Sequence, residues 1–141
     1  MLTLFTCPKP FQGRIAVLQR NAVRSWTALG AEVQVLMIGD EPGTAEAARD
    51  LGVEHIGRVE RNASGTPLIS SIFDLARRQA RHPVLGYVNA DILFLEDLLP
   101  SIRRAAERFP RYLIVGQRWD LDVEGELDFG PGWQPGLRRR L

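Results

Sequence analysis

The sequence predicts a single α/β domain with a mostly parallel sheet and helices on its flanks. Short apolar runs alternate with longer segments in which apolar residues recur every three or four positions, as strands and helices alternate in such folds. The strongest run, Val84 to Val88, is apolar on both faces, which is typical of a central strand in a covered parallel sheet. A length of 141 residues suits one domain with its own core.

The composition excludes several classes of protein. Hydrophobic residues make up 45% and charged residues 25% of the chain, the profile of a globular rather than a disordered protein. The formal net charge is only +1, so no overall basic field favours nucleic acid as a partner. No apolar run reaches the length needed to span a membrane. We therefore expect neither a nucleic-acid partner nor a membrane span, and the sequence does not predict an oligomeric state.

The cysteine content predicts a reducing compartment. Cys7 is the single cysteine, which excludes an intramolecular disulfide and a cysteine-cluster metal site. The first residues lack the charge and apolar pattern of a signal peptide. We expect the protein in the cytoplasm.

The first half of the chain predicts three strands and two helices. The two prolines of Cys7-Pro8-Lys9-Pro10 forbid helix and favour an extended loop after the first strand. Gly30 is predicted to end the first helix, in which Trp26 belongs to the apolar face, and Thr44 to cap the second. The predicted ranges are strand 2–6, helix 13–29, strand 33–38, helix 44–51 and strand 53–56.

The second half continues the alternation and then loses it. A polar loop over 58–67 precedes a predicted helix that begins at Pro67, because proline suits a first helical turn. The predicted elements are helix 67–80, the central strand from residue 84, helix 98–109 and strand 112–115. After Asp122 no apolar period remains. We therefore predict an α/β domain over residues 1–122 and a flexible Gly/Pro/Arg-rich tail over residues 123–141.

The most informative polar residues follow the predicted central strand. Asn89 and Asp91 flank Ala90 where the apolar run ends, and open α/β sheets bind ligands at the carboxyl ends of their strands. An amide and a carboxylate oxygen are hard donors suited to magnesium or manganese that carries a diphosphate. In the alternative interpretation, the tripeptide is a turn or helix cap in which Asp91 only accepts backbone hydrogen bonds.

Several stretches together resemble one family. They are Pro8 to Gly13, Gln19 to Ala22, Ser25-Trp26, Gly39 to Glu41, Asn62 to Pro67, Tyr87 to Asp91 and Arg118 to Asp122. Their order and spacing resemble glycosyltransferase-like proteins related to the family 2 nucleotide-sugar transferases. The resemblance covers residues 2–123 and implies the nucleotide-diphospho-sugar transferase fold (glycosyltransferase A-type), here partial, with a Rossmann-like sheet.

The resemblance also implies positions for a donor site. In such enzymes the loop after the first strand lines the nucleotide, an acidic residue after the second strand meets the base or ribose, and an Asp-x-Asp motif binds metal and diphosphate. Carried over, the nucleotide would contact Thr6, Pro8, Asp40, Asn62, Gly65 and Asn89, and the divalent metal (manganese or magnesium) would contact Asp91 and Asn89. Asn89 stands where the family usually has aspartate, which lowers the negative charge of the site.

The implied activity is metal-assisted transfer of a sugar from a nucleoside-diphosphate sugar to an unknown acceptor. Family 2 enzymes carry the acceptor site and catalytic base in a half that follows the stretch matched here, so we assign no catalytic base and expect that the chain alone can be inactive. An alternative is a truncated, non-catalytic remnant that binds a nucleotide or a protein. A sugar nucleotidyltransferase ranks last, because Thr6 to Gly13 lacks the Gly-rich loop of that class.

Overall fold

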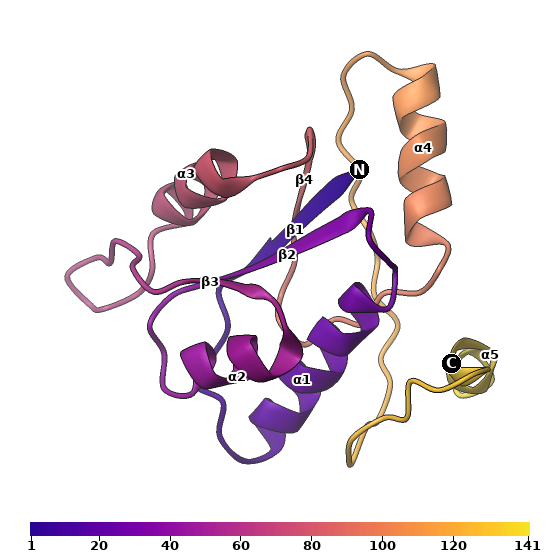
Figure 1. Cartoon of the computed structure of the whole chain (residues 1–141), viewed down its shortest axis with the longest axis horizontal. Coiled ribbons are helices and arrows are strands. Elements are labelled where there is room, and N and C mark those ends of the chain that lie inside the picture. Colours follow the sequence, from indigo (N-terminus) through magenta and orange to yellow (C-terminus); the bar gives the residue numbers. More distant parts are fainter.

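The structure is a computed structural model that describes every residue from Met1 to Leu141. Strands and helices alternate over most of the chain (Figure 1). The elements are β1 (Leu2–Thr6), α1 (Gly13–Thr27), β2 (Val33–Ile38), α2 (Thr44–Leu51), β3 (Glu54–Ile56), α3 (Ile69–Gln79), β4 (Val84–Tyr87), α4 (Leu98–Arg108) and α5 (Trp133–Arg138). None of the helices is both long and apolar enough to cross a membrane.

The four strands form one parallel sheet in the order β3-β2-β1-β4. β1 lies inside the sheet, pairing with β2 from Leu2 opposite Val33 and with β4 from Leu2 opposite Val84. This arrangement is Rossmann-like and confirms the predicted α/β class. Because the strands are parallel, the four loops that follow them lie along one edge of the sheet, where such folds bind ligands.

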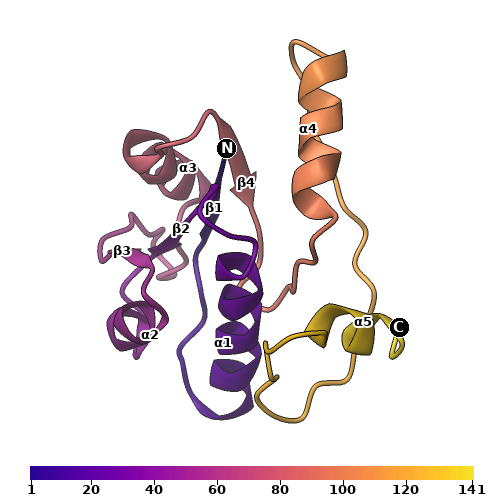
Figure 2. The ribbon, with the colours of Figure 1, turned by 45° about the vertical axis from the view of Figure 1, so that its right-hand side comes forward.

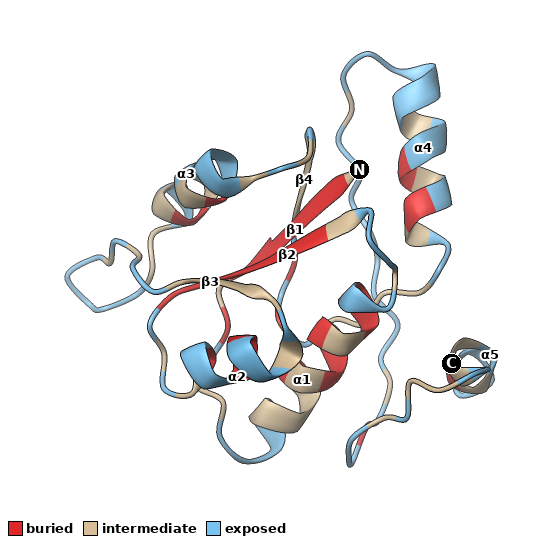
Figure 3. Ribbon diagram, in the orientation of Figure 1, coloured by how far each residue is buried: buried red, intermediate tan, exposed pale blue.

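The two faces of the sheet carry different apolar clusters, since successive strand residues point to opposite sides. Figure 3 shows that β1 and most of β2 are buried. One face packs against α1 and α2, and Trp26 is fully buried there, as the sequence predicts. The other face packs against α3, where the rings of Phe5 and Phe73 meet edge to face with centroids 4.9 Å apart. Both helical layers are therefore attached by apolar burial.

The prediction that Val84–Val88 is a central strand is wrong. β4 occupies one end of the sheet and pairs only with β1. Its residues are half-buried, and Tyr87 keeps 40% of its surface exposed. The apolar run reflects two covered faces, whereas the outer edge has no neighbouring strand.

The predicted strand Tyr112–Val115 is also absent. Leu113 and Val115 are 87% and 83% exposed in an extended segment without strand pairing. Topology supplies a reason. The connection from β3 to β4 runs through α3 on the face opposite to α1. A right-handed connection from β4 to a further strand beyond it would have to place its helix on the same face as α3. α4 instead buries Leu99 and Ile102 in the cluster on the α1 face.

Smaller differences lie at the ends of elements, such as β3, which begins at Glu54 rather than Val53. α1 ends at Thr27 rather than Leu29, and α3 begins at Ile69, which leaves Pro67 outside it in a bridge with Arg61. Gly43, not Thr44, occupies the N-cap of α2 with a φ of 82°. Glycine adopts this left-handed backbone with little strain, which explains why the cap falls one residue earlier than predicted.

Residues 123–141 have an organisation that the sequence pattern does not predict. Figure 2 shows this stretch beside α1, with α5 near the carboxyl end. The buried side chain of Asn21 donates a hydrogen bond to the Gly125 carbonyl and accepts one from the Leu127 amide, both at 2.9 Å. Val123 and Leu137 are also buried. A side chain on α1 thus replaces the missing backbone partners of an irregular segment.

Candidate functional site

The loop after β1 is held from inside the protein. The carboxamide of Gln19 accepts a hydrogen bond from the Lys9 amide at 2.8 Å and donates one to the Lys9 carbonyl at 2.9 Å. Thr6 and Pro8 are buried, and the Thr6 hydroxyl has no hydrogen-bond partner. Both residues therefore pack on the inner side of the loop, whereas Lys9 is exposed on its outer side.

An ion-pair cluster joins the loops after β2 and β3. One terminal nitrogen of Arg61 donates to Asp40 at 2.6 Å and to Glu41 at 2.9 Å. The other terminal nitrogen donates to the Gly65 carbonyl at 2.8 Å. The hydrogen bond from Arg61 is the main cause that lowers the pKa of the Asp40 carboxyl, and a backbone hydrogen bond of Asp40 and the charge of Arg61 lower it further. The sequence-predicted residues Asp40 and Gly65 are thus brought together by a third residue.

The thiol of Cys7 lies next to this cluster. A side-chain carbon added to Gly39 would sit 3.4 Å from its sulfur, which places the end of β1 against the end of β2. Burial raises the pKa of the Cys7 thiol, and the nearby charge of Arg61 opposes that rise only in part. Burial therefore disfavours the thiolate, and the surroundings of Cys7 do not activate it as a nucleophile.

Asn62 organises the loop after β3. Its side-chain oxygen accepts hydrogen bonds from the amides of Ser64 and Thr66, at 3.0 and 2.9 Å, an arrangement typical of an Asx turn. Gly65 has a φ of 79°, which completes the turn. The family resemblance places Asn62 beside the nucleotide, and its side-chain oxygen is thus already used within the loop.

Asn89 and Asp91 lie in a turn directly after β4. The Val88 amide still pairs with the Phe5 carbonyl, and the Ile92 amide donates to the Asn89 carbonyl at 3.2 Å. Val88 and Ala90 point inward and are buried, whereas Asn89 and Asp91 are exposed. The turn of the alternative interpretation is thus present. Neither exposed side chain forms a hydrogen bond or ion pair with another residue, so Asp91 does not accept the backbone hydrogen bonds that this interpretation expects.

The donor set fits a cation only in part. No three His, Cys, Asp or Glu side chains gather closely enough to hold a metal ion by themselves. Asn89 and Asp91 offer two free oxygen-bearing groups two residues apart, which suits a magnesium or manganese ion that takes its other ligands from phosphate and water. Two such groups could hold a cation only together with ligands from elsewhere.

A large apolar cleft of about 1480 Å³ adjoins this turn. Its walls come from β4, α4 and the extended segment after α4, and 23 of its 36 lining residues are hydrophobic. Asn89 and Asp91 contribute to its polar part, together with Arg118 and Asp120, which form an ion pair at 3.2 Å. The exposed turn therefore lies between the loops after the other three strands and an apolar surface.

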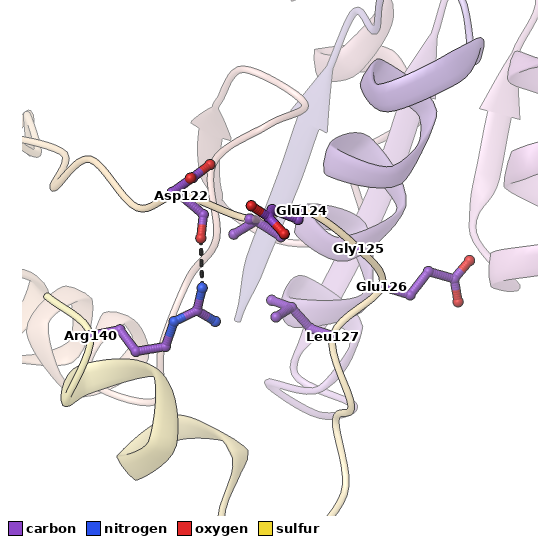
Figure 4. Close-up of a pocket in the computed structure, with 7 residues that line it drawn as sticks. Asp122, Glu124, Gly125, Glu126, Leu127 and Arg140 are labelled. Carbon is purple, nitrogen blue, oxygen red and sulfur yellow. Dashed lines mark hydrogen bonds between the residues drawn. The ribbon is translucent and has the colours of Figure 1, made fainter.

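A second, smaller cavity of about 420 Å³ lies between α5 and the segment that follows Asp122 (Figure 4). Arg140 donates to the backbone carbonyl of Asp122, and the Asp122 carboxylate pairs with Arg14 at 2.8 Å. Glu126 points away from Arg140 in Figure 4 and pairs with Arg24 at 3.0 Å. These contacts attach the last segment to α1, and the cavity is a by-product of that packing.

Arg61 and Glu41 are the site residues that sequence reasoning did not assign. A signal was available, because β2 and β3 are consecutive strands and the loops after neighbouring parallel strands lie together. A basic residue in the second loop is therefore expected to pair with the acidic residues of the first.

Comparison with protein-family models found none that matches the chain, and comparison with curated proteins found no match.

Proposed function

We propose that this chain is the nucleotide-binding part of a glycosyltransferase-like protein with the nucleotide-diphospho-sugar transferase fold, related to family 2. The parallel sheet and the four loops along its carboxyl edge support the proposal. So does the sequence resemblance set out above. The donor would be a nucleoside-diphosphate sugar, and the acceptor is unassigned. We retain the cytoplasm as the proposed location, on the evidence of the single free thiol of Cys7.

The observation that carries the proposal is the exposed turn at Asn89 and Asp91. The Asp91 carboxylate has no partner within the chain and lies at the carboxyl end of β4, next to the buried Val88 and Ala90, so it is available to a ligand at the edge where such sheets bind them. The carboxylate of Asp91 and the amide oxygen of Asn89 would hold a divalent cation. When bound with the diphosphate, such a cation neutralises the charge that develops on the leaving group.

The other residues bind and orient the donor in this proposal. The nucleoside would contact the cluster of Asp40, Glu41 and Arg61. This cluster follows β2 and β3, which β1 separates from β4 in the sheet. The loop from Thr6 to Pro10 lies between this cluster and the end of β4 and would line the nucleotide. We assign no group as the catalytic base, and transfer by this chain alone is not part of the proposal.

Substitution of Asp91 tests the assignment. We expect Asp91→Ala to lower the affinity for the preferred nucleoside diphosphate in manganese by about tenfold or more, because a hydrogen bond or ligand contact made by a charged group contributes roughly 1.5–3 kcal/mol. Asp74→Ala, which removes an exposed carboxylate on α3, is the matched control and should bind like the parent chain. Equal affinities of parent and Asp91→Ala, by titration calorimetry, would refute the site.

A second candidate is a non-catalytic domain that binds a nucleotide or a protein. The apolar cleft and the exposed Leu113 and Val115 favour it, because exposed apolar surface of this extent marks binding sites. A radiolabelled-sugar transfer assay tests the second candidate alone, because transfer by this chain is not part of the first proposal. The second candidate predicts nucleotide binding without transfer to any acceptor in a panel of glycans and lipids, whereas sugar transfer by the purified chain would exclude it.

A further inference from the structure

Two side chains of α1 hold the chain that follows β4. The indole Nε1 of Trp26 donates a hydrogen bond to the Ile92 carbonyl at 2.8 Å. The Ser25 hydroxyl accepts a hydrogen bond from the Phe94 amide at 3.0 Å. Figure 2 shows this part of the chain beside α1, between β4 and α4. Two backbone groups that lie outside any strand or helix thus find their partners on one helix.

Both of these side chains are themselves fixed. Ser25 and Trp26 are fully buried. The Ser25 hydroxyl donates its own proton to the Ala22 carbonyl at 2.6 Å, which orients its oxygen and leaves a lone pair for the Phe94 amide. Trp26 belongs to the apolar cluster on this face of the sheet, and Ile92 and Phe94 pack against the same cluster. The chain after β4 therefore rests on a rigid surface.

These contacts enclose the turn at residues 89–91, called here the 89–91 turn. Before the turn, the Val88 amide donates to a carbonyl of β1 at 3.1 Å. After the turn, Trp26 holds the carbonyl of Ile92, the residue that directly follows Asp91. The backbone is thus fixed on both sides of the exposed Asp91 carboxylate, although that carboxylate has no partner of its own.

We propose that Trp26 is a positioning residue for the carboxylate of Asp91, and that Ser25 supports the same segment. The indole N–H fixes the peptide group next to Asp91 and so keeps the 89–91 turn in one conformation before a cation binds. A turn that is fixed in advance loses less conformational freedom on binding, and this raises the affinity. The inference rests on the proposed function, since it concerns the cation site of that function.

Removal of the indole N–H tests the positioning role on the full chain. Trp26→Phe removes the donor and keeps an aromatic ring, whereas benzothienylalanine in place of Trp26 removes it with little change of shape, because sulfur replaces the N–H group. The probes are nucleoside diphosphates with and without manganese, measured by titration calorimetry. We expect both replacements to reduce the gain in affinity from manganese by about fivefold or more, the factor that corresponds to fixing the backbone of one residue. The affinity without manganese should stay as in the parent.

Asn21→Ala is the matched control for a general loss of stability. Asn21 is a buried residue of the same helix, and its side chain holds Gly125 and Leu127 rather than the chain after β4. This variant should retain the manganese gain. A full gain in both replacements of Trp26, or an equal loss in Asn21→Ala, would overturn the positioning role and leave the proposed function standing. Failure of the parent chain to bind any nucleotide would overturn both.

Hydrogen exchange without ligand tests the Trp26 contact independently of nucleotide binding. The Ile92 amide donates to the Asn89 carbonyl across the turn at 3.2 Å. It should exchange several-fold faster in both replacements of Trp26 than in the parent or in Asn21→Ala, because the turn opens more often once the Ile92 carbonyl is released. Unchanged exchange at this amide in both replacements would overturn the positioning role.

Ser25→Ala tests the second contact. The Phe94 amide loses its acceptor and should exchange several-fold faster than in the parent. The manganese gain should fall by a smaller factor than in Trp26→Phe, because Phe94 lies further along the chain from Asp91 than Ile92 does. An unchanged exchange rate at Phe94 would overturn the supporting role of Ser25.

Discussion

At the scale of single residues, the carboxyl edge of the sheet combines side chains in two different states. Asp40 and Asn62 are engaged with neighbours, one with Arg61 and the other with the amides of its own turn. Asp91 has no such partner and is exposed. The hydrogen bonds of Asp40 and Asn62 fix their positions before a ligand binds, whereas Asp91 is available to contact a ligand. A binding site needs side chains of both kinds.

The Asp40–Arg61 pair makes a prediction about pH. Arg61 lowers the folded-state pKa of Asp40, so the pair stabilises the folded state above the ordinary aspartate pKa, and this contribution disappears as the pH falls through the lowered value. In Arg61→Gln the pKa of Asp40 should rise toward the ordinary range. Carboxyl-carbon NMR titration measures both, and an Asp40 that titrates identically in the two proteins would contradict the pair.

The buried Asn21 makes a prediction about stability. Asn21→Ala removes two hydrogen bonds that hold Gly125 and Leu127 against α1. Truncation should lower the free energy of unfolding by about 1–3 kcal/mol, the range for leaving buried partners unsatisfied. Urea denaturation measures the change. A loss below about 0.5 kcal/mol would show that residues 125–127 do not rest on α1 in solution.

At the scale of elements, the loop between β2 and α2 depends on Gly43. Gly43 has a φ of 82°, and an added side-chain carbon would lie 2.9 Å from the Cβ of Phe11. Gly43→Ala should therefore cost at least about 1 kcal/mol more than Gly52→Ala, which shares the positive φ but meets open space, because overpacking adds roughly 1–3 kcal/mol. Thermal denaturation compares the two variants, and equal stabilities would contradict this packing.

At Tyr112–Val115 the structure has an exposed extended segment, where the sequence predicts a strand. Its exposed side chains predict that Leu113→Ser and Val115→Ser change the free energy of unfolding by no more than about 0.5 kcal/mol, as is usual for surface positions. Leu36→Ala, in the buried β2, should cost about 2–5 kcal/mol and serves as the comparison. A loss above about 1 kcal/mol at Leu113 would show that the segment is a packed strand after all.

These elements also show how far sequence reasoning reaches. The bounds of β1, β2 and α2 agree with the prediction, because proline, glycine and the change of apolar period mark their ends locally. The position of β4 at the sheet edge could not be predicted, since it depends on whether a fifth strand pairs with it. The contact between Asp40 and Arg61 joins residues 21 positions apart and becomes visible only when the strand order is known.

At the scale of the whole molecule, the sheet has two unlike ends. The β3 end carries the charged cluster of Asp40, Glu41 and Arg61, and the β4 end carries the free turn and the apolar cleft. In the proposed function, a nucleotide laid along the carboxyl edge would place its nucleoside at the first end and its diphosphate at the second. The cleft beyond β4 would then adjoin the diphosphate, on the side from which an acceptor or a partner would approach.

The most direct measurement is calorimetric titration of the full chain with a panel of nucleoside diphosphates, with and without manganese. The account predicts that one nucleotide binds, that manganese strengthens binding by about tenfold or more, and that Asp91→Ala abolishes this gain while Asp74→Ala retains it. Absence of binding by every nucleotide in either condition would contradict the account. The α/β fold would then be present without the proposed nucleotide chemistry.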